Sequence, residues 1–317
     1  ESIGDLIHSE TELQRDQAIK LIQGNASNYY NDLREKLIKS LSYIEAKIDF
    51  TEDDLPEKVL KEVQNSIKEI HKDIHKIIED NKIGEKIRDG FRVSITGEVN
   101  AGKSSLLNLI AKRDVAIVSD EAGTTRDVIE TYLNIDGYPV ILADTAGIRV
   151  AKNEVEKKGI SLALGKSKEA DLNIVVIDNS SKSVNDEIKK MINKDTIVLL
   201  NKSDVLDKQN HKFDADTVLA SVKENKNIES LIKKIKEKLS KKFTSNNTAL
   251  ITRERHRVKL NQCLIEIDNF LKKDQNKDLE LAAEDLRMAT RHLGSIVGKV
   301  DVEEILGSIF KDFCIGK

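Results

Sequence analysis

Tryptophan is absent from the 317-residue chain and aromatic residues make up only 4% of it, whereas charged residues reach 34%. Helices with solvated faces are therefore expected to dominate. The two cysteines, Cys263 and Cys314, lie far apart, which argues against a disulfide framework and for a reducing, cytosolic setting. No apolar run is long enough to span a membrane and no signal peptide is recognisable, so we expect a cytoplasmic protein without a membrane partner.

The net charge bears on nucleic-acid binding, and the length of the chain bears on the number of domains. A formal net charge of −3 gives no global electrostatic reason to expect nucleic-acid binding. A chain of 317 residues can form two domains with hydrophobic cores. Its first residue is Glu1 rather than Met, so we expect a fragment and give little weight to absent N-terminal sequence.

The strongest motif is the segment Gly97–Ser105, which reads G-E-V-N-A-G-K-S-S and matches the G-x-x-x-x-G-K-[ST] phosphate-binding loop without a mismatch. The preceding run, Phe91–Thr96, alternates like a strand, and the following run, Leu106–Ala111, reads as an amphipathic helix. This strand–loop–helix context favours a nucleotide site over the simpler alternative, a glycine-rich turn without a ligand.

The residue types in this loop suit phosphate chemistry. Gly97 and Gly102 let backbone N–H groups approach phosphate oxygens, because a Cβ at either position would obstruct the approach. The helix that follows turns its positive end toward the same anion. Lys103 supplies a charge to the β- and γ-phosphates, and the Ser104 hydroxyl supplies a ligand for Mg²⁺. The loop residues expected to bind the nucleotide are Asn100, Ala101, Gly102, Lys103, Ser104 and Ser105.

Two motifs that follow later strands choose guanine over adenine. Asn201-Lys202-Ser203-Asp204 directly follows an apolar strand at 196–200. The Asp204 carboxylate can accept hydrogen bonds from the N1–H and N2–H₂ groups of guanine, which adenine does not offer. After the next strand, Ser221, Val222 and Lys223 suit a backbone contact to guanine O6.

Two further motifs are expected at the γ-phosphate. Asp144-Thr145-Ala146-Gly147 ends a strand at 139–143, where Asp144 would hold Mg²⁺ through water and the Gly147 N–H would meet the γ-phosphate. Gly123-Thr124-Thr125-Arg126-Asp127 lies in the loop before the second strand, where Thr125 completes the Mg²⁺ shell. These four motifs, all of which follow the phosphate loop in the chain, indicate together with it a site for GTP and Mg²⁺.

Hydrolysis also needs a group that orients the attacking water. In Ras-like enzymes a glutamine after D-x-x-G does this, but that position here is Ile148, which cannot. No arginine finger can be assigned. Arg126 and Arg149 are nearby candidates, although either could be a solvated loop residue or an ion-pair partner.

Helical patterns flank this α/β segment on both sides. Apolar residues recur at three- and four-residue steps at 6–48, 60–78 and 260–297. Strands are predicted at 93–96, 127–135, 139–143, 173–178, 196–200 and 217–220, and helices at 153–167, 183–193 and 227–242. The predicted fold class is α/β plus all-α, with a Ras-like, doubly wound, mostly parallel G domain (89–244) inserted between two parts (1–88 and 245–317) of one helical bundle domain.

Two features of the helices have alternative readings. His71 and His75 lie four residues apart and could hold a metal, but they have no third ligand in view, so a solvated helix face is the simpler reading. The lysines of segment 227–242 could form a nucleic-acid patch, for which a solvated helix face is again the safer reading.

Together the motifs resemble those of the MnmE (TrmE) family of tRNA-modification GTPases. The resemblance runs from Asp5 to Lys317 and rests on G-E-V-N-A-G-K-S-S-L-L-N, S-D-E-A-G-T-T-R-D, D-T-A-G-I-R, N-E-V-E-K-K-G-I and the terminal F-C-I-G-K. It implies a helical domain interrupted by a G domain, and G domains that form a homodimer in the GTP state. It also implies an FAD-dependent partner subunit, MnmG, with which the family modifies the wobble uridine of certain tRNAs.

The resemblance further implies activation by potassium, whose charge takes the place of an arginine finger by neutralising charge that develops on the leaving group. By resemblance, Asn100 and Thr124 are K⁺ ligands together with main-chain oxygens of Ser119 and Glu121. Proline, threonine and isoleucine are usual in the family where this chain has Val99, Ser119 and Glu121. The residues of this loop expected at the nucleotide and cations are Ser119, Asp120, Glu121, Ala122, Gly123, Thr124 and Thr125.

By the same resemblance, Glu156 is the catalytic residue, which orients the attacking water through a second water. It would supply the function that Ile148 cannot. Without the resemblance, Glu156 reads as an exposed helix carboxylate.

The family also carries an N-terminal domain that dimerises and binds a formyl-tetrahydrofolate. We expect this chain to lack that domain, and we therefore do not expect folate to bind the chain alone. By resemblance, the tail with Cys314 and Lys317 reaches toward the folate; the alternative for Cys314 is an inert tail residue.

Two other functions remain open at this point. A ribosome-assembly GTPase of the Era or Der type shares the phosphate loop and the D-T-A-G pattern, but no G-x-x-G loop of a KH-like RNA-binding domain is found. A nucleotide-gated helical scaffold would bind partners with little turnover.

Overall fold

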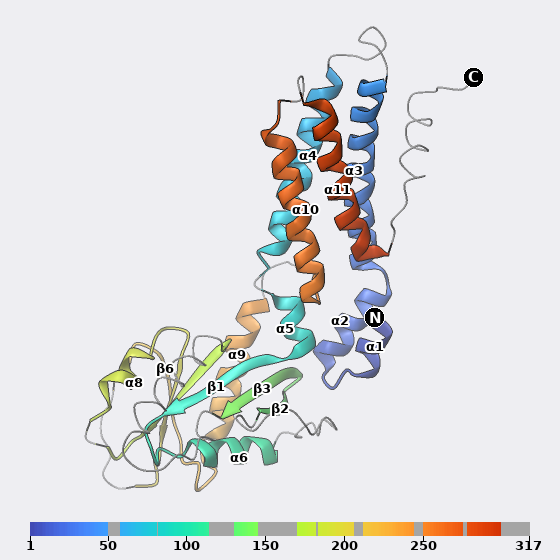
Figure 1. Cartoon of the computed structure of the whole chain (residues 1–317). Helices are drawn as coiled ribbons and strands as arrows, with labels where there is room; N and C mark the ends of the chain where they lie inside the picture. The colour runs from blue at the N-terminus through green and yellow to red at the C-terminus, as the bar shows by residue number, and fades with distance from the viewer. Residues whose placement is uncertain are drawn as a thin grey trace, which may run out of the picture. The chain divides into compact units, whose positions relative to one another are not determined.

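The computed structural model describes residues 1–49, 58–80, 82–113, 130–144, 170–181, 183–205, 212–243, 250–274 and 278–298. The chain divides into two compact units, and Figure 1 labels most of their helices and strands. One unit consists of residues 1, 3–16 and 86–246 and contains the sheet. The other consists of residues 2, 17–85 and 247–317 and is helical.

The first 49 residues form three helices, α1 (Ser2–Ile7), α2 (Glu12–Ile22) and α3 (Asn25–Asp49), where the sequence suggested one continuous helical pattern. At the start of α2, the Gln14 N–H donates to the Thr11 hydroxyl (3.3 Å) and the Glu10 N–H donates to the Gln14 side chain (3.1 Å). This reciprocal capping starts a new helix. Gly24, with φ +89°, separates α2 from α3.

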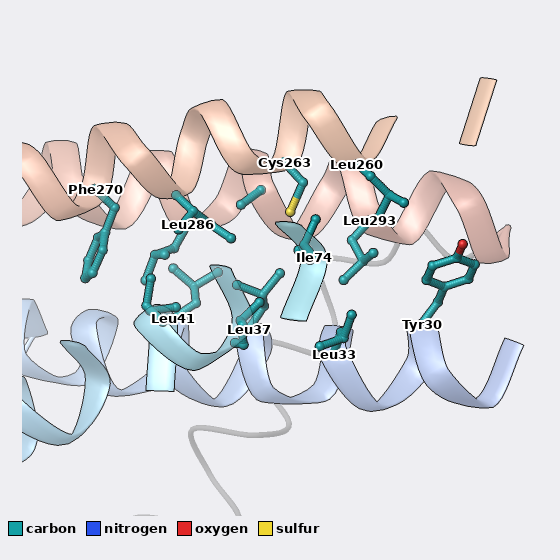
Figure 2. Close-up of a cluster of buried hydrophobic side chains, with 14 of the residues drawn as sticks. Tyr30, Leu33, Leu37, Leu41, Ile74, Leu260, Cys263, Phe270, Leu286 and Leu293 are labelled. Carbon is teal, nitrogen blue, oxygen red and sulfur yellow. The ribbon is translucent and has the colours of Figure 1, made fainter. Parts of the chain in front are cut away.

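The helical unit is a four-helix bundle of α3, α4 (Lys58–Ile78), α10 (Glu254–Lys272) and α11 (Leu279–Val297). Helices α3 and α10 each pack against both α4 and α11. The predicted apolar stripes face inward, and Figure 2 shows side chains from all four helices meeting in one cluster. Fully buried members of this core include Leu33, Leu37, Leu41, Ile67, Ile70, Ile74, Leu260, Cys263, Ile267, Leu286, Ala289 and Leu293.

Cys263 is a core residue of this bundle. Burial raises the pKa of its thiol to about 12, so at neutral pH the side chain is an uncharged, unreactive apolar group. Each of the two histidines on α4 contacts a different carboxylate: His71 lies 3.1 Å from Asp268 and His75 lies 3.4 Å from Glu79. Within the described ranges, no group of three or more His, Cys, Asp or Glu side chains could hold a metal ion.

The sheet unit confirms the predicted mostly parallel, doubly wound sheet. Its strands lie in the order β2-β3-β1-β4-β5-β6, with β2 antiparallel to β3 and all other neighbours parallel. The strands are β1 (Phe91–Gly97), β2 (Glu130–Ile135), β3 (Tyr138–Asp144), β4 (Leu172–Asp178), β5 (Ile197–Asn201) and β6 (Asp216–Leu219). Helix α5 (Ile83–Asp89) begins in the helical unit and leads into β1. The helices α6 (Lys103–Arg113), α8 (Asp186–Lys190) and α9 (Ile228–Phe243) belong to the sheet unit.

Helix α8 is shorter than the predicted helix at 183–193. The Asn185 side chain caps it by accepting a hydrogen bond from the Glu187 N–H (2.8 Å), so the helix begins only after this residue. Ile188 packs with Val175 and Val198 of the neighbouring strands. No helix in the described part of the chain is both long enough and apolar enough to cross a membrane.

Candidate nucleotide-binding site

Four of the strands end at the same edge of the sheet, and the phosphate loop and the loop Asn201–Asp204 begin there. β1 ends at Gly97, β3 at Asp144, β4 at Asp178 and β5 at Asn201. These strands are parallel neighbours, and their registers place Gly97 opposite Val176 and Asp178 opposite Asn201. In a doubly wound sheet this carboxyl edge is where a ligand binds.

Glycine is required at both ends of the phosphate loop. Gly97 has φ +142° and Gly102 has φ +104°, which side chains disfavour. A Cβ on Gly97 would lie 2.1 Å from the Val176 carbonyl oxygen, and one on Gly102 would lie 2.2 Å from the Asn201 amide nitrogen. The backbone therefore passes very close to two neighbouring elements, and only glycine fits.

The side chains of the loop fit a nucleotide with its cations. The Lys103 ammonium donates to the carbonyl oxygens of Gly97 (3.0 Å) and Glu98 (2.7 Å), so it lies across the loop that would surround the phosphates. Ser104 is exposed at the start of α6, where a hydroxyl can reach Mg²⁺. Asn100 is exposed and left-handed (φ +62°), and its amide has no hydrogen-bond partner among the described residues. An amide oxygen of this kind is a suitable ligand for a hard cation.

Asn201 joins the phosphate loop to the two motifs that are predicted to recognise the base. Its side chain is buried and donates to the Ala101 carbonyl (2.8 Å), while its amide oxygen accepts from the Val222 N–H (3.0 Å). This side chain thus links its own loop to one loop that lies 100 residues away and to another that lies 21 residues away in the chain. A buried amide that is hydrogen-bonded through both its nitrogen and its oxygen holds loops in a single arrangement.

Asp204 is held in place by Ser221. The buried Ser221 hydroxyl donates to the Asp204 carboxylate (2.6 Å), and the Glu224 N–H donates to the same hydroxyl (3.2 Å). The hydrogen bond from Ser221 lowers the pKa of Asp204, so this carboxylate is ionised at neutral pH. Next to it, the Ser203 N–H donates to the Ala220 carbonyl (3.0 Å), and Lys223 is exposed. The two predicted base motifs therefore lie together at the sheet edge.

Sequence reasoning missed the last residue of β4. Asp178 accepts hydrogen bonds from Lys202, within the predicted base motif, and from Ser180. The available signal was its position: a carboxylate that ends a buried strand next to Asn201, followed by the polar run Asn179-Ser180-Ser181.

Three lysines on α9 contact carboxylates of their own unit. Lys234 (2.8 Å) and Lys238 (3.0 Å) both contact Asp216, and their hydrogen bonds lower the pKa of Asp216 to about 2. Lys236 contacts Asp136. These ion pairs favour a solvated helix face over a nucleic-acid patch.

A family model for the MnmE helical domain matches residues 1–314 of this chain. The tRNA modification GTPase MnmE of Pelagibacter ubique (strain HTCC1062) is 57% identical over 323 residues, which cover 100% of this chain and 72% of that relative. The chain belongs to the MnmE family of GTP hydrolases. MnmE of Rickettsia bellii (strain RML369-C) is 45% identical over 324 residues, with the same coverage of both proteins. The solved G domain of the T. maritima FeoB iron transporter is 25% identical, with a TM-score of 0.36, over 47% of this chain and 98% of that one.

Membership of the MnmE family confirms the resemblance read from the motifs and decides against the Era or Der alternative. The other residues predicted for an MnmE-type site lie outside the described part of the structure, as does the side chain of Asp144, and their roles stay predictions. They are Ser119, Asp120, Glu121, Ala122, Gly123, Thr124, Thr125, Arg126, Thr145, Ala146, Gly147, Ile148, Arg149, Glu156, Cys314 and Lys317.

Proposed function

We propose that this chain is a potassium-stimulated GTPase whose G domains pair in the GTP state, and that this cycle drives modification of the tRNA wobble uridine together with an FAD-dependent, MnmG-like subunit. The tRNA part is supported by the names of its relatives, which are tRNA modification GTPases. We further propose a G domain at 89–244 inserted into one helical domain made of 1–88 and 245–317.

The proposed potassium site is supported mainly by the position and exposure of the Asn100 side chain. Its exposed amide, on a left-handed backbone in the phosphate loop, has no protein partner in the described part of the chain. A monovalent cation bound there would supply positive charge between the β- and γ-phosphates, where an arginine finger acts in other GTPases. No arginine of the described residues is assigned to this place.

The described residues have separate roles in this proposal. Lys103 binds the β- and γ-phosphates, and the Ser104 hydroxyl is a ligand for Mg²⁺. Asp204 accepts the N1–H and N2–H₂ groups of guanine. Asn201 keeps the phosphate loop and the base loops at a fixed separation through its contacts with Ala101 and Val222. Glu156 is proposed to orient the attacking water, and we assign no step to folate in this chain.

Turnover in KCl compared with NaCl of equal ionic strength tests the cation part. We expect GTP hydrolysis to be faster in KCl by about tenfold or more, because one well-placed electrostatic group typically changes kcat by about 10²–10³-fold. Asn100→Ala should remove the difference between the salts while GDP affinity stays near the parental value. Equal rates in both salts would contradict potassium activation. Slow hydrolysis at a rate that does not depend on the cation would favour the nucleotide-gated scaffold.

Glu156→Ala is expected to lower kcat by about 100-fold, the lower end of what a positioned acid–base group contributes. GTP affinity should stay within about twofold, because the proposed contact is with water and not with the nucleotide. Single-turnover hydrolysis and GTP binding should be measured on the same preparation. Glu154→Ala removes a carboxylate two residues away in the same motif and should leave both values unchanged. A loss of affinity as large as the loss of rate would contradict the assignment.

A further inference from the structure

Asp178 lies beside the base loop without belonging to any predicted motif. It is the last residue of β4, and its neighbour in the parallel register is Asn201, the last residue of β5. Directly after it, the Asn179 N–H donates to the Asn201 carbonyl (2.9 Å). The end of β4 is therefore bonded to the start of the loop Asn201–Asp204.

Both carboxylate oxygens of Asp178 are used. One accepts the Lys202 ammonium at 2.5 Å. The other accepts the Ser180 hydroxyl (2.6 Å) and the Ser180 N–H (2.9 Å). Burial acts to raise the pKa of Asp178, but these hydrogen bonds from Lys202 and Ser180 lower it, so the group is charged at neutral pH. A charged carboxylate that accepts three hydrogen bonds is fixed in position, and its hydrogen bond to the Lys202 ammonium is a strong one.

The backbone of Lys202 has a conformation that needs support from neighbouring contacts. Its backbone is left-handed, with φ +65°, a conformation that costs free energy in a residue other than glycine and is kept only when neighbouring contacts hold it. Lys202 lies between Asn201, whose side chain is fixed by two buried hydrogen bonds, and Asp204, which is fixed by Ser221. Its ammonium contact with Asp178 is the one side-chain hydrogen bond found for Lys202 among the described residues.

We propose that Asp178 is a positioning residue for guanine-nucleotide binding, which acts through Lys202 to hold the loop Asn201–Asp204 in the conformation that receives the base. The role is separate from the phosphate contacts, which belong to Lys103 and its loop. It rests on the proposed assignment of Asp204 to guanine, and the substitution Asp204→Asn tests that assignment by itself.

The experiment measures the dissociation constant and release rate of a fluorescent GDP analogue, together with kcat for GTP, in the full chain. Asp178→Asn keeps the size of the side chain but removes its charge, and Lys202→Met removes the other partner of the same contact. We expect each to weaken GDP binding by about tenfold through faster release, since hydrogen bonds to charged groups are among the stronger ones. The double variant should be no weaker than Lys202→Met, because both changes remove one interaction. In Asp178→Asn, which lies outside the predicted motifs, kcat at saturating GTP should stay within about twofold, and Asp178→Glu should recover part of the affinity.

Asp136→Asn is the matched control. Asp136 also pairs with a lysine, Lys236, but lies in the turn between β2 and β3, outside the carboxyl edge of the parallel strands. Its left-handed backbone (φ +51°) tolerates asparagine. GDP release at the parental rate in Asp178→Asn, or losses that multiply in the double variant, would overturn the proposal. If Asp178→Asn does not fold, Lys202→Met gives the decisive release rate. An unchanged preference of Asp204→Asn for GTP would instead overturn the proposed base assignment.

Discussion

Replacing Asp204 by asparagine is expected to change the preferred nucleotide of this chain from GTP to XTP. The hydrogen bond from Ser221 lowers the pKa of Asp204, so the side chain is an anion that can only accept hydrogen bonds. Guanine offers two donors, N1–H and N2–H₂, to such a group. Asparagine offers one acceptor and one donor, and xanthine has a carbonyl oxygen in place of the 2-amino group. Each base therefore fits one of the two side chains and leaves the other with an unpaired polar group.

The ratio of the two affinities should change by about 10⁴-fold, the range found when a site built for one hydrogen-bonding pattern meets another. Competition of GTP and XTP against a fluorescent nucleotide measures the ratio of the two affinities in the parental chain and in Asp204→Asn. Asp195→Asn makes the same chemical change in the turn before β5, at the opposite end of that strand, and should leave the preference for GTP intact. Tighter GTP than XTP binding by Asp204→Asn would show that another group reads the base.

The phosphate loop could be predicted from sequence because its requirements are local. Glycine, lysine and serine at fixed spacing, between a strand and a helix, are all visible in one short window. The base motif Asn201–Asp204 was predictable for the same reason. The close approach of Gly102 to the Asn201 side chain was not, because it joins residues about 100 positions apart and depends on how β1 and β5 stand in the sheet.

Asp178 shows the same limit more clearly. In the sequence it is one carboxylate at the end of an apolar run, and nothing nearby indicates Lys202 as its partner. The pairing appears only once the register of β4 and β5 is known. Glu156 differs again, because its role was read from a family resemblance and lies outside the described residues. From its residue type and position alone, Glu156 would be interpreted as an exposed carboxylate on a helix.

Within the helical bundle, the apolar stripes were predictable from their periodicity, but its buried charges were not. Arg257 of α10 is 6% exposed, and it contacts Asp80 (3% exposed) and Glu85 (7% exposed). Its guanidinium donates to the Glu85 carboxylate (2.8 and 3.1 Å), to Asp80 (2.8 Å) and to the Ile78 carbonyl (2.6 Å). Burial would lower the pKa of Arg257, but the hydrogen bonds to Glu85 and Asp80 raise it. This one side chain bonds to the end of α4, the turn after it and the first part of α5.

Arg257→Met is expected to lower the free energy of unfolding of the helical unit by about 3–5 kcal/mol, the usual cost of removing one partner from a buried ion pair. The loss arises because two carboxylates stay buried without their cation. Arg287→Met is the matched control: Arg287 contacts Glu45 and Glu284 on the surface, and loss of an exposed pair costs about 1 kcal/mol or less. The triple variant Asp80→Asn, Glu85→Gln, Arg257→Met should recover part of the loss, since it leaves no unpaired charge.

A probe for the helical unit alone is needed, because the chain has two units and a single unfolding transition cannot be assumed. Cys263 supplies it. In a Cys314→Ser background it is the only thiol, and it is fully buried among the bundle helices, so alkylation in increasing urea reports opening of the bundle. Arg257→Met should move this alkylation to much lower urea than Arg287→Met does. Equal shifts for the two arginines would mean that the buried cluster contributes no more to the bundle than a surface ion pair.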